Sequence, residues 1–195
     1  MPDGRRRESF AERRERRATV DDPATVLDAA ARFLESRSRS VAEVRRRLTT
    51  AGYRVDLVAG AIDRLTELGM LDDEAFARQW VESRDRARPR GERALRDELR
   101  LKGIDHATVD AVLDERRSGV SGSTDVDESP TPDRTAAERL IEKHARTLRR
   151  IADPRQRRQR AYALLARNGF DPETCREVAA RVTTMDEDLD GDFPA

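Results

Sequence analysis

The chain has few of the residues that carry catalysis, cross-linking or membrane insertion. Its 195 residues include one cysteine and two histidines, which excludes an internal disulfide framework and a cysteine-cluster zinc site. Aromatic residues make up 4% and apolar residues 36% of the chain, a low share for a single compact globule. No apolar run approaches the roughly 18–20 residues of a membrane helix, and no apolar stretch follows the basic start as in a secretory signal. We therefore expect a cytoplasmic protein that does not enter a membrane.

Lysine is nearly absent, although 39 basic and 39 acidic residues give a formal net charge of zero. Every basic residue except Lys102 and Lys143 is arginine, whose planar group can bind phosphate or carboxylate through two hydrogen bonds. GC-rich codon usage is the simpler explanation of this bias, so the distribution is more informative. Residues 146–167 contain eight arginines and one acid, Asp153, whereas residues 186–192 contain five acids and no base. Blocks of one charge favour contact with charged partners.

One pattern occurs three times: an apolar residue, a leucine four positions later, a glycine after four more, and then another apolar residue. The spacing predicts one stripe of an α-helix, and the glycine predicts the left-handed residue that ends it. A second amphipathic helix follows each glycine, and room for a third lies upstream, at 26–34, 76–81 and 136–148. The three copies are Val44–Tyr53, Leu95–Ile104 and Ala161–Phe170.

A polar stretch separates the second copy from the third. Residues 118–133 are rich in Gly, Ser, Pro and acids, a composition that predicts a flexible linker. No long alternating strand pattern occurs, so we predict an all-α protein of three tandem three-helix repeats, with a disordered N-terminal arm and an acidic tail. The predicted boundaries are 1–23 for the arm, 24–70, 71–117 and 134–184 for the repeats, 118–133 for the linker and 185–195 for the tail.

Signals for helix starts support this organisation. Ser40 and Glu43 have the spacing of a capping box. The adjacent acids Asp72 and Asp73 are better explained as a helix N-cap than as a metal site or a general base. Three aspartates precede a proline that suits the first helical position: Asp22, Asp153 and Asp171.

No catalytic or metal-binding constellation can be proposed from the sequence. Phosphate-loop, dinucleotide-binding and zinc-protease motifs do not occur. His106 and His144 have no second ligand at metal spacing. Cys175 takes the place that Val58 and Val109 hold in the other repeats, which predicts a small buried side chain rather than a nucleophile. We expect no enzyme activity, no cofactor and no metal.

Two features remain as candidates for contact with a partner. Phe76, Trp80 and Val81 have helical spacing, and we interpret them as a core stripe rather than an exposed platform for stacking bases. The second feature is a set of arginine clusters. One cluster precedes a predicted helix N-terminus, and another opens the middle helix of the third repeat. On that helix we expect Tyr162 and Leu165 to be the buried residues. The candidate partner- or DNA-binding residues are Arg45, Arg46, Arg47, Arg84, Arg86, Arg88, Arg90, Arg155, Arg157 and Arg158.

Several of these segments resemble the RecX family of RecA regulators. The shared features are a helix ending in Arg-x-Arg-Ser at Arg37–Ser40, a glycine turn leading into the Asp-Asp-x-x-Phe-Ala of 72–77, and Gly91 before the second repeat's middle helix. Similarity spans roughly 25–184 and is clearest over 29–115. The resemblance implies tandem three-helix repeats in an elongated, curved body.

The resemblance also implies a function and a partner. Such a protein binds RecA recombinase filaments and inhibits their recombinase, ATPase and coprotease activities in DNA repair and the SOS response. The implied partners are the RecA filament and, weakly or through the filament, single-stranded DNA, with the protein acting as a monomer. Two alternatives stay open: a stand-alone helical nucleic-acid-binding protein that uses helix-turn-helix-like repeats, and a generic helical scaffold. The zero net charge weighs against the first alternative.

Overall fold

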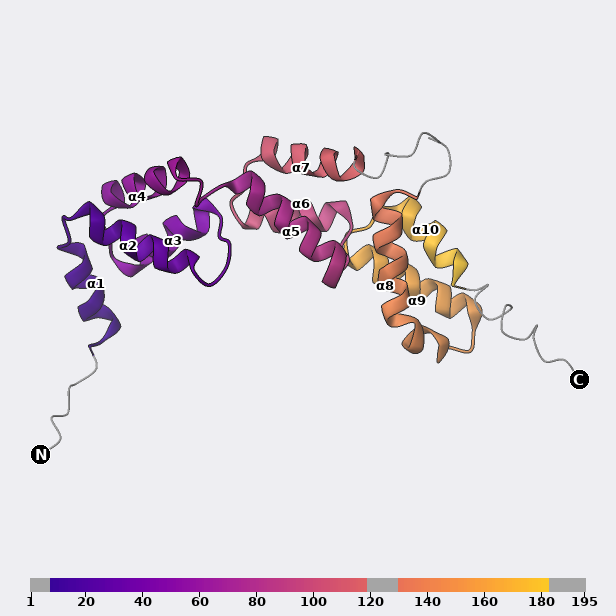
Figure 1. The fold of residues 1–195 in the computed structure, drawn as a ribbon. Helices are drawn as coiled ribbons and strands as arrows, with labels where there is room; N and C mark the ends of the chain where they lie inside the picture. Colours follow the sequence, from indigo (N-terminus) through magenta and orange to yellow (C-terminus); the bar gives the residue numbers. More distant parts are fainter. Residues whose placement is uncertain (1–7, 119–129, 183–195) are drawn as a thin grey trace, which may run out of the picture. The chain divides into compact units, whose positions relative to one another are not determined.

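The computed structural model describes residues 8–118 and 130–182, and these residues form ten α-helices and no strand (Figure 1). They belong to two compact units. Unit 1 contains the described residues up to Phe76 together with Lys102–Ile104, and unit 2 contains Ala77–Leu101 and the described residues from Asp105 on. None of these helices is both long and apolar enough to cross a membrane.

Nine of these helices form three successive groups of three, which confirms the predicted all-α class and three-helix repeats. The helices predicted at 26–34, 76–81 and 136–148 are each longer than predicted. The first repeat contains α2 (Pro23–Leu34), α3 (Val41–Ala51) and α4 (Val55–Glu67); the second contains α5 (Asp73–Ala87), α6 (Glu92–Leu101) and α7 (His106–Ser118); the third contains α8 (Pro132–Arg149), α9 (Pro154–Arg167) and α10 (Pro172–Arg181).

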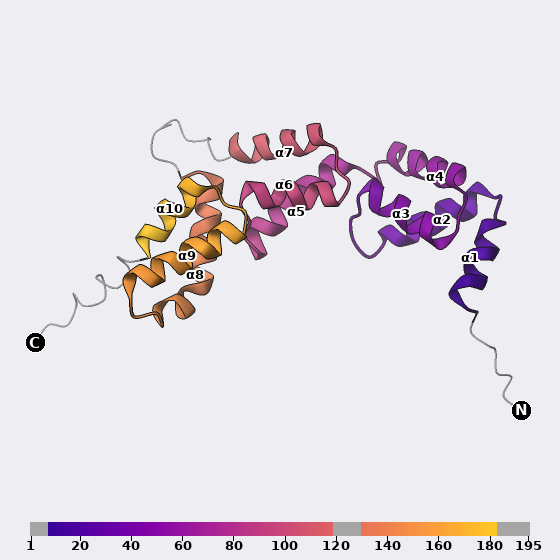
Figure 2. The same cartoon turned by 180° about the vertical axis from the view of Figure 1, so that it is seen from behind.

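The cores of the first and third repeats are continuous apolar clusters. In unit 1, Val44 and Leu48 of α3 pack with residues of α2 and α4, and these helices lie side by side in both views (Figures 1 and 2). In unit 2, the cluster of the third repeat includes Leu165 of α9 and Cys175 of α10. Cys175 is fully buried, which confirms its predicted place in the core, and burial raises the pKa of its thiol to about 11.

The three repeat glycines end their helices in the predicted left-handed conformation, with φ of 106° at Gly52, 82° at Gly103 and 83° at Gly169. A residue with a Cβ is strained in this region, whereas glycine adopts it freely. The residue after the first of these glycines, Tyr53, donates its backbone N–H to the Leu48 carbonyl and thereby closes the last turn of α3.

The predicted N-caps are also present. Ser40 and Glu43 form a complete capping box at α3. Asp72 accepts hydrogen bonds from the backbone N–H groups of Glu74 and Ala75 and so caps α5. Three aspartates accept backbone hydrogen bonds in front of a proline, at the starts of α2, α9 and α10: Asp22, Asp153 and Asp171.

In unit 1, the start of α3 is held by residues from the following repeat. Asp73 of α5 accepts a 2.9 Å hydrogen bond from the N–H of Val41, the first residue of α3. The Ser40 hydroxyl donates to the carbonyl oxygen of Lys102 at 2.6 Å. A Cβ on Gly103 would lie 2.3 Å from the Ala42 side chain. The second aspartate of the Asp72–Asp73 pair therefore stabilises a helix other than its own.

In unit 2, the start of α6 is held in the same way. Asp133 of α8 accepts a 3.0 Å hydrogen bond from the N–H of Glu92, the first residue of α6. The N–H of Gly91, in the position of Ser40, donates to the carbonyl oxygen of Asn168, which precedes the turn glycine of the third repeat. The same three elements thus meet at both junctions: a helix start, an aspartate from the next repeat, and the next repeat's glycine turn.

The segment predicted as a charged arm contains a helix that we did not predict, α1 (Phe10–Ala18), which has a complete Ser9–Glu12 capping box and buries no residue. It packs on α3, where Arg14 lies against Gly52 and the Arg17 guanidinium lies 5.6 Å from the Tyr53 ring centroid. Both ends of the predicted linker are helical, because α7 ends at Ser118 and α8 begins at Pro132. Residues 1–7, 119–129 and 183–195, which include the acidic tail, lie outside the described residues.

Candidate interaction surface

The arginine run on α3 is exposed, as expected from its apolar stripe. Arg45, Arg46 and Arg47 each face solvent, while Val44 and Leu48 are buried beside them. The Arg47 guanidinium lies 5.6 Å from the ring centroid of Phe33, close enough for a cation–π contact. The other two side chains are the more available for a partner.

The second cluster, Arg84–Arg90, is largely engaged within the protein. Arg84 donates to Glu98 at 2.6 Å and lies 4.1 Å from the centroid of the Trp80 ring. Arg90 also pairs with Glu98, at 3.4 Å, and donates to the side-chain oxygen of Asn168. Arg86 pairs with Glu82, one turn away on α5. Arg88 is exposed.

The aromatic residue in this cluster is not a stacking platform. Trp80 is half-buried, donates its indole N–H to Glu98 at 2.8 Å, and is covered by Arg84. Phe76 and Val81 are buried, so the interpretation as a core stripe is confirmed for these two residues.

The third cluster, on α9, divides into one buried and two exposed arginines. Arg155 and Arg158 are exposed, and in the part of the chain that the structure describes no acid forms an ion pair with either. Arg157 is 6% exposed and donates its Nε–H to the Ile151 carbonyl at 3.0 Å. Arg157 therefore holds the turn between α8 and α9, a structural role that its charge did not predict.

Tyr162 corrects a second prediction about α9. We expected it to be buried with Leu165, but 37% of its surface is exposed. The buried stripe of α9 is Arg157, Ala161 and Leu165 at four-residue spacing, and a residue next to Ala161 is turned by about 100° from it. Tyr162 consequently lies on the face of α9 that carries Arg155.

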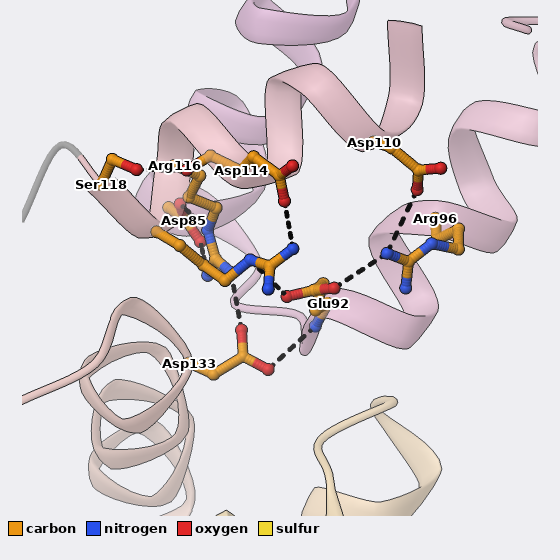
Figure 3. A network of polar contacts seen from close by, with 9 residues as sticks. Asp85, Glu92, Arg96, Asp110, Asp114, Arg116, Ser118 and Asp133 are labelled. Atoms are coloured by element: carbon orange, nitrogen blue, oxygen red, sulfur yellow. Dashed lines mark hydrogen bonds and ion pairs between the residues drawn. The ribbon is translucent and has the colours of Figure 1, made fainter. Parts of the chain in front are cut away.

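A network of charged side chains at the junction of the second and third repeats escaped sequence reasoning (Figure 3). At its centre, the side chain of Arg116 of α7 is 7% exposed. It donates twice to Asp85 of α5 at 2.9 Å and once to Asp133 of α8 at 2.6 Å. Asp133 also accepts the hydrogen bond from the Glu92 N–H at the start of α6. Arg116 thereby joins three helices, and it brings together residues from the two sides of the segment 119–129.

Burial and hydrogen bonding shift the pKa values of Arg116 and Asp133 in this network. Burial lowers the pKa of Arg116, but the hydrogen bonds to Asp85 and Asp133 outweigh burial and raise it above its ordinary value. Burial raises the pKa of Asp133, and the contacts with Arg116 and the Glu92 N–H offset only part of that effect. Arg116 is consequently a permanent charge that depends on two carboxylates for compensation.

The two histidines, His106 and His144, are not part of a metal site in the described structure. Among the described residues no group of His, Cys, Asp and Glu could hold a metal ion. His106 begins α7 and contacts the Arg100 guanidinium through Nδ1 at 3.0 Å. The Nδ1 of His144 lies 2.9 Å from the Leu140 carbonyl oxygen, one turn earlier on α8.

The fold defines the class: an all-helical protein of tandem three-helix domains with arginines on its exterior. Three family models match in order, described as the first, second and third three-helix domains of RecX, over residues 27–65, 72–113 and 133–179. Proteins named "Regulatory protein RecX" are similar over most of the chain. The one from Mycolicibacterium vanbaalenii is 36% identical over 153 residues, covering 75% of this chain and 76% of that protein.

A second relative and two solved structures agree. The "Regulatory protein RecX" of Mycolicibacterium smegmatis is 36% identical over 152 residues, 76% of this chain and 74% of that protein. A crystal structure of regulatory protein RecX matches with a TM-score of 0.66 and 21% identity, over 84% of this chain and 74% of that one. RecX from Lactobacillus salivarius matches with a TM-score of 0.67 and 19% identity, over 83% and 97%. The chain belongs to the RecX family.

Proposed function

We propose that this protein binds RecA recombinase filaments in the cytoplasm and inhibits their recombinase, ATPase and coprotease activities, without catalysis of its own. The observation that carries the proposal is the ordered match of all three RecX domains, together with curated relatives named as regulatory proteins. Tandem repeats offer an extended surface that is suited to binding a partner such as a filament.

The exposed arginines supply such a surface. Arg45 and Arg46 on α3, with Arg155 and Arg158 on α9, face solvent and pair with no acid among the described residues. Their guanidinium groups can contact acidic patches of RecA or the phosphates of the DNA within the filament. Arg84 and Arg90, which share Glu98, are less suited to this role.

The test is inhibition of RecA by the purified full chain. We expect it to slow DNA-dependent ATP hydrolysis, strand exchange and repressor cleavage, and we expect it to hydrolyse no ATP by itself. Removing both pairs of arginines in one variant should weaken inhibition by one to two decades. Arg64→Ala is the matched control, because it removes an exposed cation that already pairs with Glu67.

Two outcomes would contradict the proposal. The first is an unchanged RecA ATPase rate at saturating concentrations of folded protein. The second is tight binding to one particular duplex sequence with no effect on RecA, which would favour a stand-alone helix-turn-helix protein.

A further inference from the structure

One face of α9 combines cations with an exposed aromatic ring beside a cavity. At about 100° per residue, Arg155, Arg158 and Tyr162 lie within about 60° of one another around the helix, on the side that flanks the buried stripe of Ala161 and Leu165. We call these three residues the α9 face. Arg155 and Tyr162 are seven residues apart, about 10 Å along the axis at ~1.5 Å per residue.

The cations of the α9 face form no side-chain ion pair within the described residues, although the Asp153 carboxylate caps the same helix by accepting the Arg155 N–H at 2.9 Å. Neither Arg155 nor Arg158 forms an ion pair there, and the first turn of α9 contains no acid. The face is also fixed in place, because the buried Arg157 holds the α8–α9 turn through the Ile151 carbonyl. Exposed guanidinium groups on a helix that is held in place are suited to an anionic partner, since the helix itself loses little entropy when the partner binds.

The aromatic end of the face opens into a cavity of about 520 Å³ in unit 2. Tyr162 and Ala166 line it from α9, Phe170 lines it from the turn that follows, and Arg93 lines it from α6. Arg93 is exposed. Three carboxylates also line it, and each is engaged within the protein: Glu92 by Arg96, Asp133 by Arg116, and Asp171 as the cap of α10. The exposed part of the Tyr162 ring provides a surface on which a planar ring can stack.

We propose that the α9 face binds a single strand of nucleic acid, with backbone phosphates on Arg155 and Arg158 and a base stacked on Tyr162 at the cavity. Single-strand binding surfaces combine cations that follow the backbone with aromatic rings that stack on bases. At the duplex rise of ~3.4 Å per nucleotide of one strand, the distance from Arg155 to Tyr162 spans at most about three nucleotides, and an extended single strand spans it with fewer. An acidic protein surface would use the two arginines but has no need of an exposed ring in line with them.

The inference rests on the proposed function for its setting, since a RecA filament on single-stranded DNA presents such a strand. The binding itself does not involve RecA. It can therefore be measured with the full chain and two fluorescent 20-nucleotide probes, oligo(dT) and an abasic strand of the same length, by fluorescence anisotropy.

The variants separate stacking from charge. Tyr162→Ala should weaken binding of oligo(dT) about tenfold, within the range measured for one stacked base, and binding of the abasic strand less than twofold. Tyr162→Phe should restore oligo(dT) binding. The double variant Arg155→Ala/Arg158→Ala should weaken both probes and reduce the slope of log affinity against log salt by about 1.4, for two phosphates on a single strand.

The matched control removes the same charge from another side of the same helix. Arg160 and Arg167 are exposed and lie about 120–140° around α9 from Arg155. The Arg160→Ala/Arg167→Ala variant should lose less than a third of the affinity lost by the Arg155/Arg158 variant. Circular dichroism and the melting temperature check that each variant is folded.

Three results would overturn the inference: equal weakening of both probes by Tyr162→Ala, an equal loss in the control double variant, or loss of RecA inhibition in Arg155→Ala/Arg158→Ala with unchanged oligo(dT) binding. The last result would assign the α9 face to RecA itself and leave the proposed function intact. If the probes behave as expected but the wild-type protein leaves RecA unaffected, the proposed function fails and the binding site stands.

Discussion

The junction of the second and third repeats and the α9 face use the same residue type in opposite ways. At the junction, Arg116 is enclosed by Asp85 and Asp133 and is almost inaccessible to solvent. On the α9 face, Arg155 and Arg158 are exposed and form no ion pair in the described structure. The arginines of this chain therefore serve two purposes: some join helices through ion pairs, and others provide an exposed surface. The positions of the acidic residues decide which purpose an arginine serves.

The largest effect should come from removing the central arginine of the junction. Arg116→Ala leaves two carboxylates in a partly buried site without a cation, and breaking such a pair typically costs about 3–5 kcal/mol. Urea unfolding should show this loss. Arg155→Ala is the matched control and should change the free energy of unfolding by no more than about 0.5 kcal/mol. Equal losses in the two variants would remove the distinction between the two regions.

A smaller effect should follow from crowding the same junction. A Cβ on Gly91 would lie 2.4 Å from backbone atoms of Gly169 and Phe170, which cannot move aside easily, so Gly91→Ala should destabilise the protein by about 1–3 kcal/mol. Gly60→Ala should have the opposite sign, because a Cβ at that site on α4 would meet nothing within 4 Å beyond its chain neighbours and its own helix backbone, and alanine favours a helix interior by about 1 kcal/mol. Thermal unfolding of both variants measures the contrast, and a stabilised Gly91→Ala would contradict the close contact.

The smallest effect concerns the corresponding charged site in unit 1. Burial raises the pKa of Glu43, but the hydrogen bond and charge of Lys102 outweigh burial, and the pKa is lowered from 4.5. A carboxyl with a lowered pKa in the folded state stabilises the protein above its ordinary pKa, and this contribution is lost as the pH falls through the folded value. Glu43→Gln should therefore be less stable than wild type at pH 7, with the difference shrinking toward pH 3.

Denaturant unfolding at both pH values tests this expectation. Glu35→Gln, at an exposed position that follows α2, should differ little from wild type at either pH. A difference between Glu43→Gln and wild type that stays constant from pH 7 to pH 3 would show that Glu43 does not act through its charge.

The sequence contains most of the information needed to predict the helices, because their starts and ends are local signals. Gly52 and Ser40 mark a helix end and a helix start through their own conformation and hydrogen bonds. The helix α1 was predictable on the same basis, since Ser9 and Glu12 form a capping box. It escaped prediction because no apolar stripe follows these two residues and the helix buries none of its own.

The interaction surface was less predictable, because it depends on contacts between distant residues. The sequence alone does not show that Arg84 contacts Glu98 or that Arg116 contacts Asp133, because the members of these pairs lie 14 and 17 positions apart. The burial of Arg157 depends on one backbone carbonyl in a turn. The exposure of Tyr162, by contrast, follows from the four-residue spacing of Ala161 and Leu165, a periodicity present in the sequence.

Proline at the start of α9 distinguishes the third repeat from the first two. At α3 and α6, the first residue donates its N–H to an aspartate of the next repeat. The first residue of α9 is Pro154, which has no N–H, and Asp153 already caps the helix from within the same repeat. The start of α9 therefore has no N–H at this position to donate to an aspartate, and the hydrogen bond that links the first repeat to the second and the second to the third has no counterpart there.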